Sequence, residues 1–296
     1  MPSPPSGDPL VAAGFEGWFG GIVKVVRRDF VPLALFQLIY LVAWVVIGAL
    51  FAIVLGLWLG PDLLDVMDGT DPAAKAEVMR SFTGDDFVIV FVLAVVALLV
   101  GLVVTTWISA ASMFVIIRRA ARYRAKVSEA LRFAAARMFP LFGWSLLCIV
   151  MFLPGVALFF VPAIGWLLAV VLWVYLLTVF VASLLGVVVV ERVGIGRCFA
   201  LVHPRFFPTL GRLVIVAVAN IVYGVVVMLI LTGLGLASDP SAANPVAQLV
   251  GWVLAIPASV VLVAASVVTY TELRGRLDRT ATSATLAAEL VRPPVR

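Results

Sequence analysis

Few residues of this chain have the type and spacing that chemistry requires, and the single histidine is the first to consider. His203 stands in the sequence LVHPRFF, directly before Pro204. One interpretation makes its imidazole a proton acceptor. The other makes it a residue that ends a helix, because the position before a proline is disfavoured in the helical region. We favour the second, since no further ligand or orienting carboxylate lies nearby in the sequence.

The cysteines and the clustered aspartates have spacings that argue against metal binding. Cys148 falls in an apolar stretch and Cys198 in a basic one, without C-x-x-C or Cys/His spacing, so we expect neither a disulfide nor a metal site. An acidic segment carries an aspartate at every third position, at Asp62, Asp65, Asp68 and Asp71. This spacing does not match the twelve-residue calcium loop. We interpret the segment as a solvated loop rather than a cation site, and we predict no cofactor.

An adjacent acid and base, Glu191 and Arg192, follow a run of four valines. Glu191 has two open roles: a catalytic acid, or one half of a structural ion pair that fixes a turn between helices. We favour an ion pair with Arg192 or with arginines of neighbouring segments, and we predict no catalytic residue.

The apolar stretches contain few polar side chains, and the candidates for a polar cluster among them are Gln37, Asn220 and Tyr223. Amides at membrane depth need partners, and interhelical hydrogen bonds contribute about 0.6 kcal/mol each. Such bonds are the default interpretation. The alternative is a polar cluster in a substrate cavity.

A basic run, RRAARYRAK at 118–126, forms the last candidate site. One role of these charges is to keep the segment in the cytoplasm during membrane insertion. Near an anionic leaflet each Lys or Arg also contributes about 1 kcal/mol of attraction. We therefore predict contacts with anionic lipid or a partner protein at Arg118, Arg119, Arg122, Arg124, Lys126, Arg197 and Arg205.

The composition shows what kind of element must position these residues. Hydrophobic residues make up 64% of the 296 residues and charged residues 12%, against roughly half and a quarter in soluble domains. A net charge of +5 is compatible with nucleic-acid binding. However, the basic residues lie beside apolar stretches, so membrane lipids are the expected partners and nucleic acid is not.

Six long apolar stretches, without charged residues in their central parts, predict six transmembrane helices. A bilayer core about 30 Å thick needs about 20 apolar residues of helix. We place the spans at residues 31–59, 87–117, 140–161, 164–190, 207–236 and 246–270. The predicted fold is all-α, a polytopic integral membrane protein in which the third and fourth spans form a tight hairpin.

The basic residues also predict the orientation. Of the 21 Lys and Arg residues, 19 lie in the N-terminal segment, after the second and fourth spans, or in the C-terminal tail. Positively charged loops stay cytoplasmic. Arg outnumbers Lys 18 to 3, which is typical of a GC-rich bacterium, so we expect a bacterial inner membrane with both termini cytoplasmic. The expected regions are a disordered tail at 1–9, a membrane domain at 10–276 and a cytoplasmic tail at 277–296.

A short pattern occurs three times: an amphipathic stretch, a basic residue, Phe and Pro, and then a span. The copies are Gly14–Leu33, Val127–Leu141 and Gly194–Leu210. Amphipathic helices of this kind lie in the membrane interface, and proline fits the start of the following helix. We predict three units, each an elbow helix plus a two-span hairpin. The alternative is that basic, aromatic interfaces of this sort recur by chance in any polytopic protein.

The third copy, in VVVVERVGIGRCFALVHPRFFPTLGRL, resembles the membrane domain found beside bacterial glycerophosphodiester phosphodiesterases and in related six-span bacterial families. The tail TYTELRGRLD and the opening GFEGWFGGIVKVVRRDFVPL are similar to that family as well. In those fusions the phosphodiesterase activity belongs to a separate soluble barrel with Glu, His and Asp around a metal. Nothing in this sequence corresponds to that barrel, so the resemblance implies no enzymatic activity.

Two functions from different classes remain. Catalysis needs a nucleophile, base or metal held together, and proton-coupled pumps normally carry an ionisable group in mid-membrane, so we predict neither. The first function is a scaffold or accessory subunit that binds lipid, another membrane protein or a second copy of itself. The alternative is a transporter or permease component that moves a lipid-like substrate between the hairpins.

Overall fold

The structure is a computed structural model that describes residues 8, 10, 14–59, 84–162, 164–236, 245–278 and 280–292. All regular secondary structure in these residues is helical. Six helices among them are long and apolar enough to cross a membrane. This confirms the all-α, six-span prediction, and the chain is a multi-pass membrane protein.

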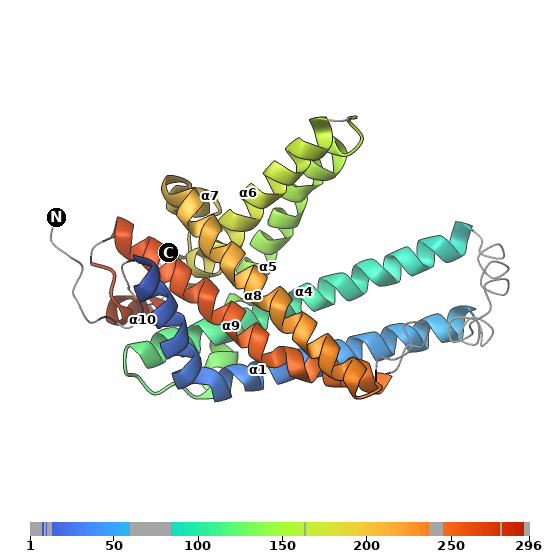
Figure 1. Ribbon diagram of the computed structural model, residues 1–296, viewed down its shortest axis with the longest axis horizontal. Helices are drawn as coiled ribbons and strands as arrows, with labels where there is room; N and C mark the ends of the chain where they lie inside the picture. The colour runs from blue at the N-terminus through green and yellow to red at the C-terminus, as the bar shows by residue number, and fades with distance from the viewer. Residues whose placement is uncertain are drawn as a thin grey trace. The chain divides into compact units, whose positions relative to one another are not determined.

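The long helices follow the predicted spans and extend beyond several of them (Figure 1). They are α1 (Gly14–Leu59), α4 (Gly84–Ala120), α5 (Val127–Leu158), α6 (Ile164–Gly186), α8 (Phe206–Gly233) and α9 (Pro245–Leu277). The π-helix η1 (Val187–Glu191) continues α6. Three shorter helices complete the described chain: α7 (Gly196–Val202), the 3₁₀-helix η2 (His203–Arg205) and α10 (Ser283–Val291).

The prediction of a separate elbow helix in each of the three predicted units is wrong for the first two. In the first two units the elbow and the span are one continuous helix, α1 and α5, with Pro32 and Pro140 inside. A continuous helix keeps almost every backbone group bonded where lipid offers no water. Only the third unit is segmented, because α7, η2 and α8 follow one another as separate helical elements.

The prediction that His203 leaves the helical region before Pro204 is wrong. Its backbone angles are φ −53° and ψ −45°, which are helical values. The chain changes here from α-helical to 3₁₀ hydrogen bonding, so the segment ends α7 without leaving the helical region.

The chain divides into two compact units, and the first contains residues 1–37, 106–221 and 257–296. Its core is built around large side chains that are almost fully buried, including Trp18, Phe36, Met113 and Tyr270. Within it α5 and α6 form the predicted hairpin (Figure 1). The indole Nε1 of Trp173 on α6 donates to the Phe152 carbonyl of α5 at 3.2 Å.

The second unit contains residues 38–105 and 222–256. Here a Cβ built at Gly101 would lie only 2.5 Å from the Trp44 ring, so α1 and α4 pack closely at this glycine. The Tyr223 hydroxyl donates to the Leu254 carbonyl at 2.7 Å and joins α8 to α9. Many aliphatic side chains of this unit are exposed, as expected for helix faces that meet lipid tails.

Candidate functional site: a buried charge network

The π-helix η1 at the end of α6 carries Glu191. The four valines that precede Glu191 in η1 are buried. Arg192, which ends η1, adopts the left-handed conformation at φ 58° and ψ 32°, and its amide donates to the Val187 carbonyl. That conformation costs a non-glycine residue roughly 1–2 kcal/mol. Single-turn π segments are frequent at functional sites, and this one ends at Glu191.

The Glu191 carboxylate has partners on two other helices. Oε2 accepts a hydrogen bond from Nε of Arg197 at 2.9 Å. Oε1 accepts from the Tyr270 hydroxyl at 3.0 Å and lies 2.8 Å from Nη1 of Arg274. The carboxylate side chain is only 6% exposed. The carboxylate therefore ties the end of α6 to α7 and α9.

Glu272 of α9 is the second buried carboxylate of this region, and its side chain is 1% exposed. Arg212 of α8 donates from Nη1 to Oε2. Arg276, one helical turn further along α9, donates from Nε at 3.0 Å and from Nη2 at 2.6 Å to Oε1. Glu272 thus joins α8 to α9.

Arg212 also connects the Glu272 pair to α1. Its guanidinium lies over the Trp18 ring, 5.6 Å from the centroid, in a cation–π contact. The Trp18 indole Nε1 donates to Oγ1 of Thr269 at 2.9 Å. The first turns of α1 are therefore fixed to α8 and α9 through one aromatic side chain.

Arg274 extends the network to α10. Its Nη2 donates to Glu289 of α10 at 3.1 Å and lies 3.7 Å from Asp278. At this edge, hydrogen bonds from the Thr280 hydroxyl and amide hold the pKa of Asp278 below its ordinary value. We call the whole set the charge network: Glu191, Arg197, Arg212, Tyr270, Glu272, Arg274, Arg276 and Glu289.

Within the first unit, polar contacts at both ends of α10 attach this helix to the other segments. At its start, Asp8 accepts a hydrogen bond from the Ser283 amide at 2.8 Å. At its end, the Arg192 guanidinium donates to the carbonyls of Leu290 and Arg292. Leu286 and Leu290 on its apolar face are almost fully buried. The segment predicted as a cytoplasmic tail at 277–296 thus contains a packed helix.

A separate buried carboxylate, Asp29, joins α1 to α4. The Asp29 side chain is fully buried, and Arg28 donates to it from Nη2 at 2.6 Å. Arg119 of α4 lies 3.6 Å from the same carboxylate. The Arg28 Nη2 also donates to the Ile116 carbonyl at 3.1 Å. The arrangement repeats the pattern of Glu191: one buried acid and two arginines from different positions in the chain.

These contacts brace helix ends. An ionised carboxylate accepts about four hydrogen bonds, and a guanidinium does not release its proton in proteins. Each acid of the network has at least one arginine partner on another helix, so these ion pairs join different helices. Within the described ranges, no group of three His, Cys, Asp or Glu residues could hold a metal ion.

No family model matches this sequence, and neither a curated protein nor a solved structure was found to be similar to it. The resemblance to the membrane domain beside glycerophosphodiester phosphodiesterases therefore stays a prediction.

The predicted ion pair between neighbours Glu191 and Arg192 is replaced by a different pairing. Glu191 pairs with Arg197 and Arg274. Arg192 is directed away from it by its left-handed backbone and donates to carbonyls at the end of α10. The wider expectation, that Glu191 pairs with arginines of neighbouring segments, describes the structure better than the adjacent pair.

The residues predicted to contact lipid fall into two groups. Arg119 and Arg197 pair with buried carboxylates, and the Arg118 guanidinium lies 5.3 Å from the Phe114 ring centroid and 5.6 Å from that of Tyr123. The second group is exposed, and no ion pair joins its members to an acid of the described chain. These four residues are Arg122, Arg124, Lys126 and Arg205.

Two of the three residues predicted to form an intramembrane polar cluster donate hydrogen bonds to backbone carbonyls. Asn220 donates from Nδ2 to the Val216 carbonyl of its own helix at 2.9 Å. Tyr223 donates to the Leu254 carbonyl, and Gln37 is half-buried in α1. The four aspartates from Asp62 to Asp71 lie outside the described residues.

Sequence reasoning missed three acids of these sites: Asp29, Glu272 and Glu289. The sequence held a local signal for Glu272 and another for the helix that carries Glu289. Glu272 and Arg276 stand four residues apart in ELRGR, the spacing of a helical ion pair. Thr282 and Thr285 form a capping box before the leucines of α10, which was a signal for that helix.

Proposed function

We propose that this protein is a non-enzymatic scaffold or accessory subunit of a bacterial inner membrane, with both termini in the cytoplasm, that binds anionic lipid or a partner protein. The observation that carries the proposal is that its basic residues fall into two groups, one paired with buried acids and one exposed. Those in the charge network and at Asp29 brace helices, whereas Arg122, Arg124 and Lys126 are exposed in one turn after α4.

The turn has the chemistry of a membrane-surface contact. Arg122 and Arg124 flank Tyr123 in the sequence, Lys126 follows within three positions, and the Tyr123 side chain is exposed. Tyrosine is enriched at membrane–water interfaces, and basic residues near an anionic leaflet add about 1 kcal/mol each. The Arg118 guanidinium stacked on Tyr123 holds the ring at the end of α4. These features support attraction to phosphate head groups at this turn.

The test measures which lipids surround the purified protein. The protein is reconstituted into vesicles of equal phosphatidylglycerol and phosphatidylcholine, extracted into polymer nanodiscs, and the retained lipids are quantified. Replacing the three basic residues together (Arg122→Gln, Arg124→Gln, Lys126→Gln) should lower the enrichment of phosphatidylglycerol several-fold. The matched control keeps the charges (Arg122→Lys, Arg124→Lys, Lys126→Arg) and should keep the enrichment.

Two results would contradict the proposal. Equal enrichment in the wild type and the glutamine variant would show that the turn does not attract anionic lipid. Movement of a fluorescent lipid between leaflets by the reconstituted wild type, with loss in Asn220→Ala, would replace the scaffold with a lipid transporter.

A further inference from the structure

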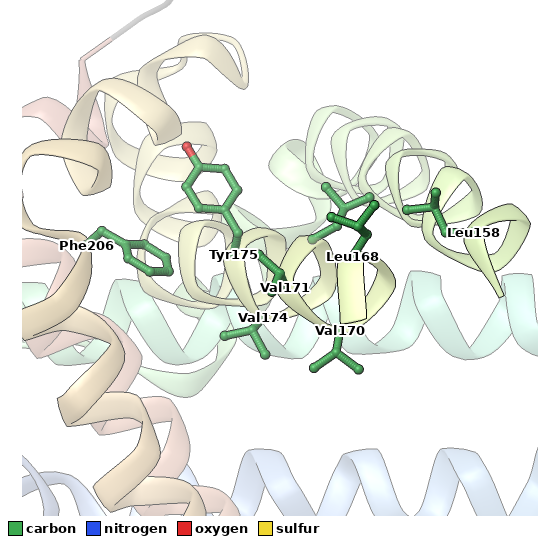
Figure 2. A pocket seen from close by; sticks show the side chains of 8 residues that line it. Leu158, Leu168, Val170, Val171, Val174, Tyr175 and Phe206 are labelled. Carbon is green, nitrogen blue, oxygen red and sulfur yellow. The ribbon is translucent and has the colours of Figure 1, made fainter. Parts of the chain in front are cut away.

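An apolar groove of about 610 Å³ is formed by α5, α6 and the first residue of α8. This volume lies within the range of about 300–1,000 Å³ typical of small-molecule sites. Leu158 of α5 and Leu168 and Val171 of α6 line one part, and Tyr175 and Phe206 line the other (Figure 2). The lining side chains are aliphatic or aromatic, and the Tyr175 hydroxyl is the one polar side-chain group among them.

The polar groups near this groove gather at the end where Tyr175 and Phe206 lie. The Tyr175 hydroxyl is 3.4 Å from Nδ1 of His203, and both belong to the same compact unit. Arg205 directly precedes Phe206, whose ring packs 5.2 Å from that of Tyr175. His203 and Arg205 are both exposed. At this end of the groove His203 therefore contacts the lining residue Tyr175, and Arg205 precedes the lining residue Phe206 in the chain.

We propose that the groove holds one acyl chain of an anionic phospholipid, whose phosphate is bound by Arg205 and His203. The inference rests on the proposed function in one respect, that the protein binds anionic lipid, and it names a second, separate site. A guanidinium matches phosphate oxygens with two parallel hydrogen bonds. When the Tyr175 hydroxyl donates to Nδ1, the ring proton of His203 stays on Nε2 and can be donated to the same phosphate.

The asymmetry of the site favours a lipid over a helix of a partner protein. A phospholipid has one charged end and a long apolar remainder, which matches a groove with basic residues at one end. The apolar face of a transmembrane helix would require no phosphate-binding group there. A second apolar groove, of about 180 Å³, lies between α1 and α4 and is lined by residues that include Ile47, Leu93 and Val96. Neither groove has a basic side chain in its lining, but only the first has a histidine and an arginine within three positions of a lining residue. A substitution that fills this second groove is therefore the control for one that fills the first.

The test is native mass spectrometry of the purified protein with phosphatidylglycerol or phosphatidylcholine of identical acyl chains. The wild type should retain one phosphatidylglycerol about tenfold more strongly than phosphatidylcholine, equivalent to about 1.4 kcal/mol. Arg205→Gln should reduce phosphatidylglycerol retention to the level of phosphatidylcholine. Val171→Trp, which fills the groove, should reduce both, whereas Val96→Trp in the second groove should leave both unchanged.

A second measurement needs no variant. Phosphatidylglycerol with a diazirine on one acyl chain is photo-crosslinked to the wild-type protein, and the labelled peptides are identified. Labelling within residues 158–175 supports the proposal, and labelling confined to other helices overturns it. Unchanged selectivity in Arg205→Gln, or a co-purifying protein lost from Val171→Trp while lipid retention stays, also overturns it.

The outcomes separate this site from the turn after α4. If the triple glutamine variant of that turn loses lipid enrichment while Arg205→Gln and Val171→Trp do not, the groove is excluded and the proposed function stands. If only the groove variants respond, the groove is supported and the lipid role of the turn is excluded.

Discussion

Glu191 accepts hydrogen bonds from Arg197 and Tyr270 and forms an ion pair with Arg274, and its carboxylate is almost excluded from solvent. Glu289 reaches the same arginine from α10, but its side chain is 32% exposed. Removing one partner of a buried pair leaves an uncompensated charge and costs far more than removing a solvated one. The two acids therefore differ in what they contribute, although both contact Arg274.

We predict that Glu191→Gln lowers the free energy of unfolding by about 3 kcal/mol, because Arg197 and Arg274 lose a buried counter-charge. The matched control Glu289→Gln should cost below about 1 kcal/mol, as expected for a partly solvated ion pair. Both are measured by SDS-induced unfolding in mixed micelles. Equal costs for the two variants would show that Glu191 is not a brace.

The six spans could be predicted because length and hydropathy suffice to identify a membrane helix. The charge network could not, because its contacts join residues that are far apart in the chain. Glu191 and Arg274 are 83 positions apart, and only the folded arrangement of α6 and α9 places them together. The exposed position of Arg205 beside an apolar groove likewise depends on how η2 packs against α6.

At the scale of elements, α6 and α9 approach each other closely at Gly186, where a Cβ would clash with the Tyr270 ring. We predict that Gly186→Ala lowers the free energy of unfolding by about 1–3 kcal/mol through overpacking. The control Gly143→Ala has open space around its Cβ and should be neutral or stabilising by about 0.5–1 kcal/mol, since alanine favours a helix. A stable Gly186→Ala variant in the same unfolding assay would refute this contact.

The docking of α10 gives a second prediction at this scale. Leu286→Ala should lower the free energy of unfolding by about 2–5 kcal/mol, because Leu286 is fully buried. Val291→Ala on the same helix should change it by less than about 0.5 kcal/mol, because Val291 is 62% exposed. If the two substitutions have the same effect in thermal unfolding, α10 is not packed on the protein in solution.

For the whole molecule, the expected one-sided distribution of charge connects the two roles of the arginines. Basic residues keep their segments in the cytoplasm during insertion. After folding, some of them neutralise buried acids at the ends of helices, and others stay exposed near the head groups. Both proposed lipid sites require that the turn after α4 and the η2 segment face the anionic cytoplasmic leaflet.

Orientation is therefore measured directly with single cysteines. Cys148 and Cys198, both buried, are replaced by alanine, and one cysteine is introduced at Lys75 or Arg124. We predict that a membrane-impermeant maleimide labels Lys75→Cys in intact spheroplasts and labels Arg124→Cys only after lysis. Labelling of Arg124→Cys in intact spheroplasts, with Lys75→Cys protected until lysis, would contradict the orientation on which the lipid-binding proposals depend.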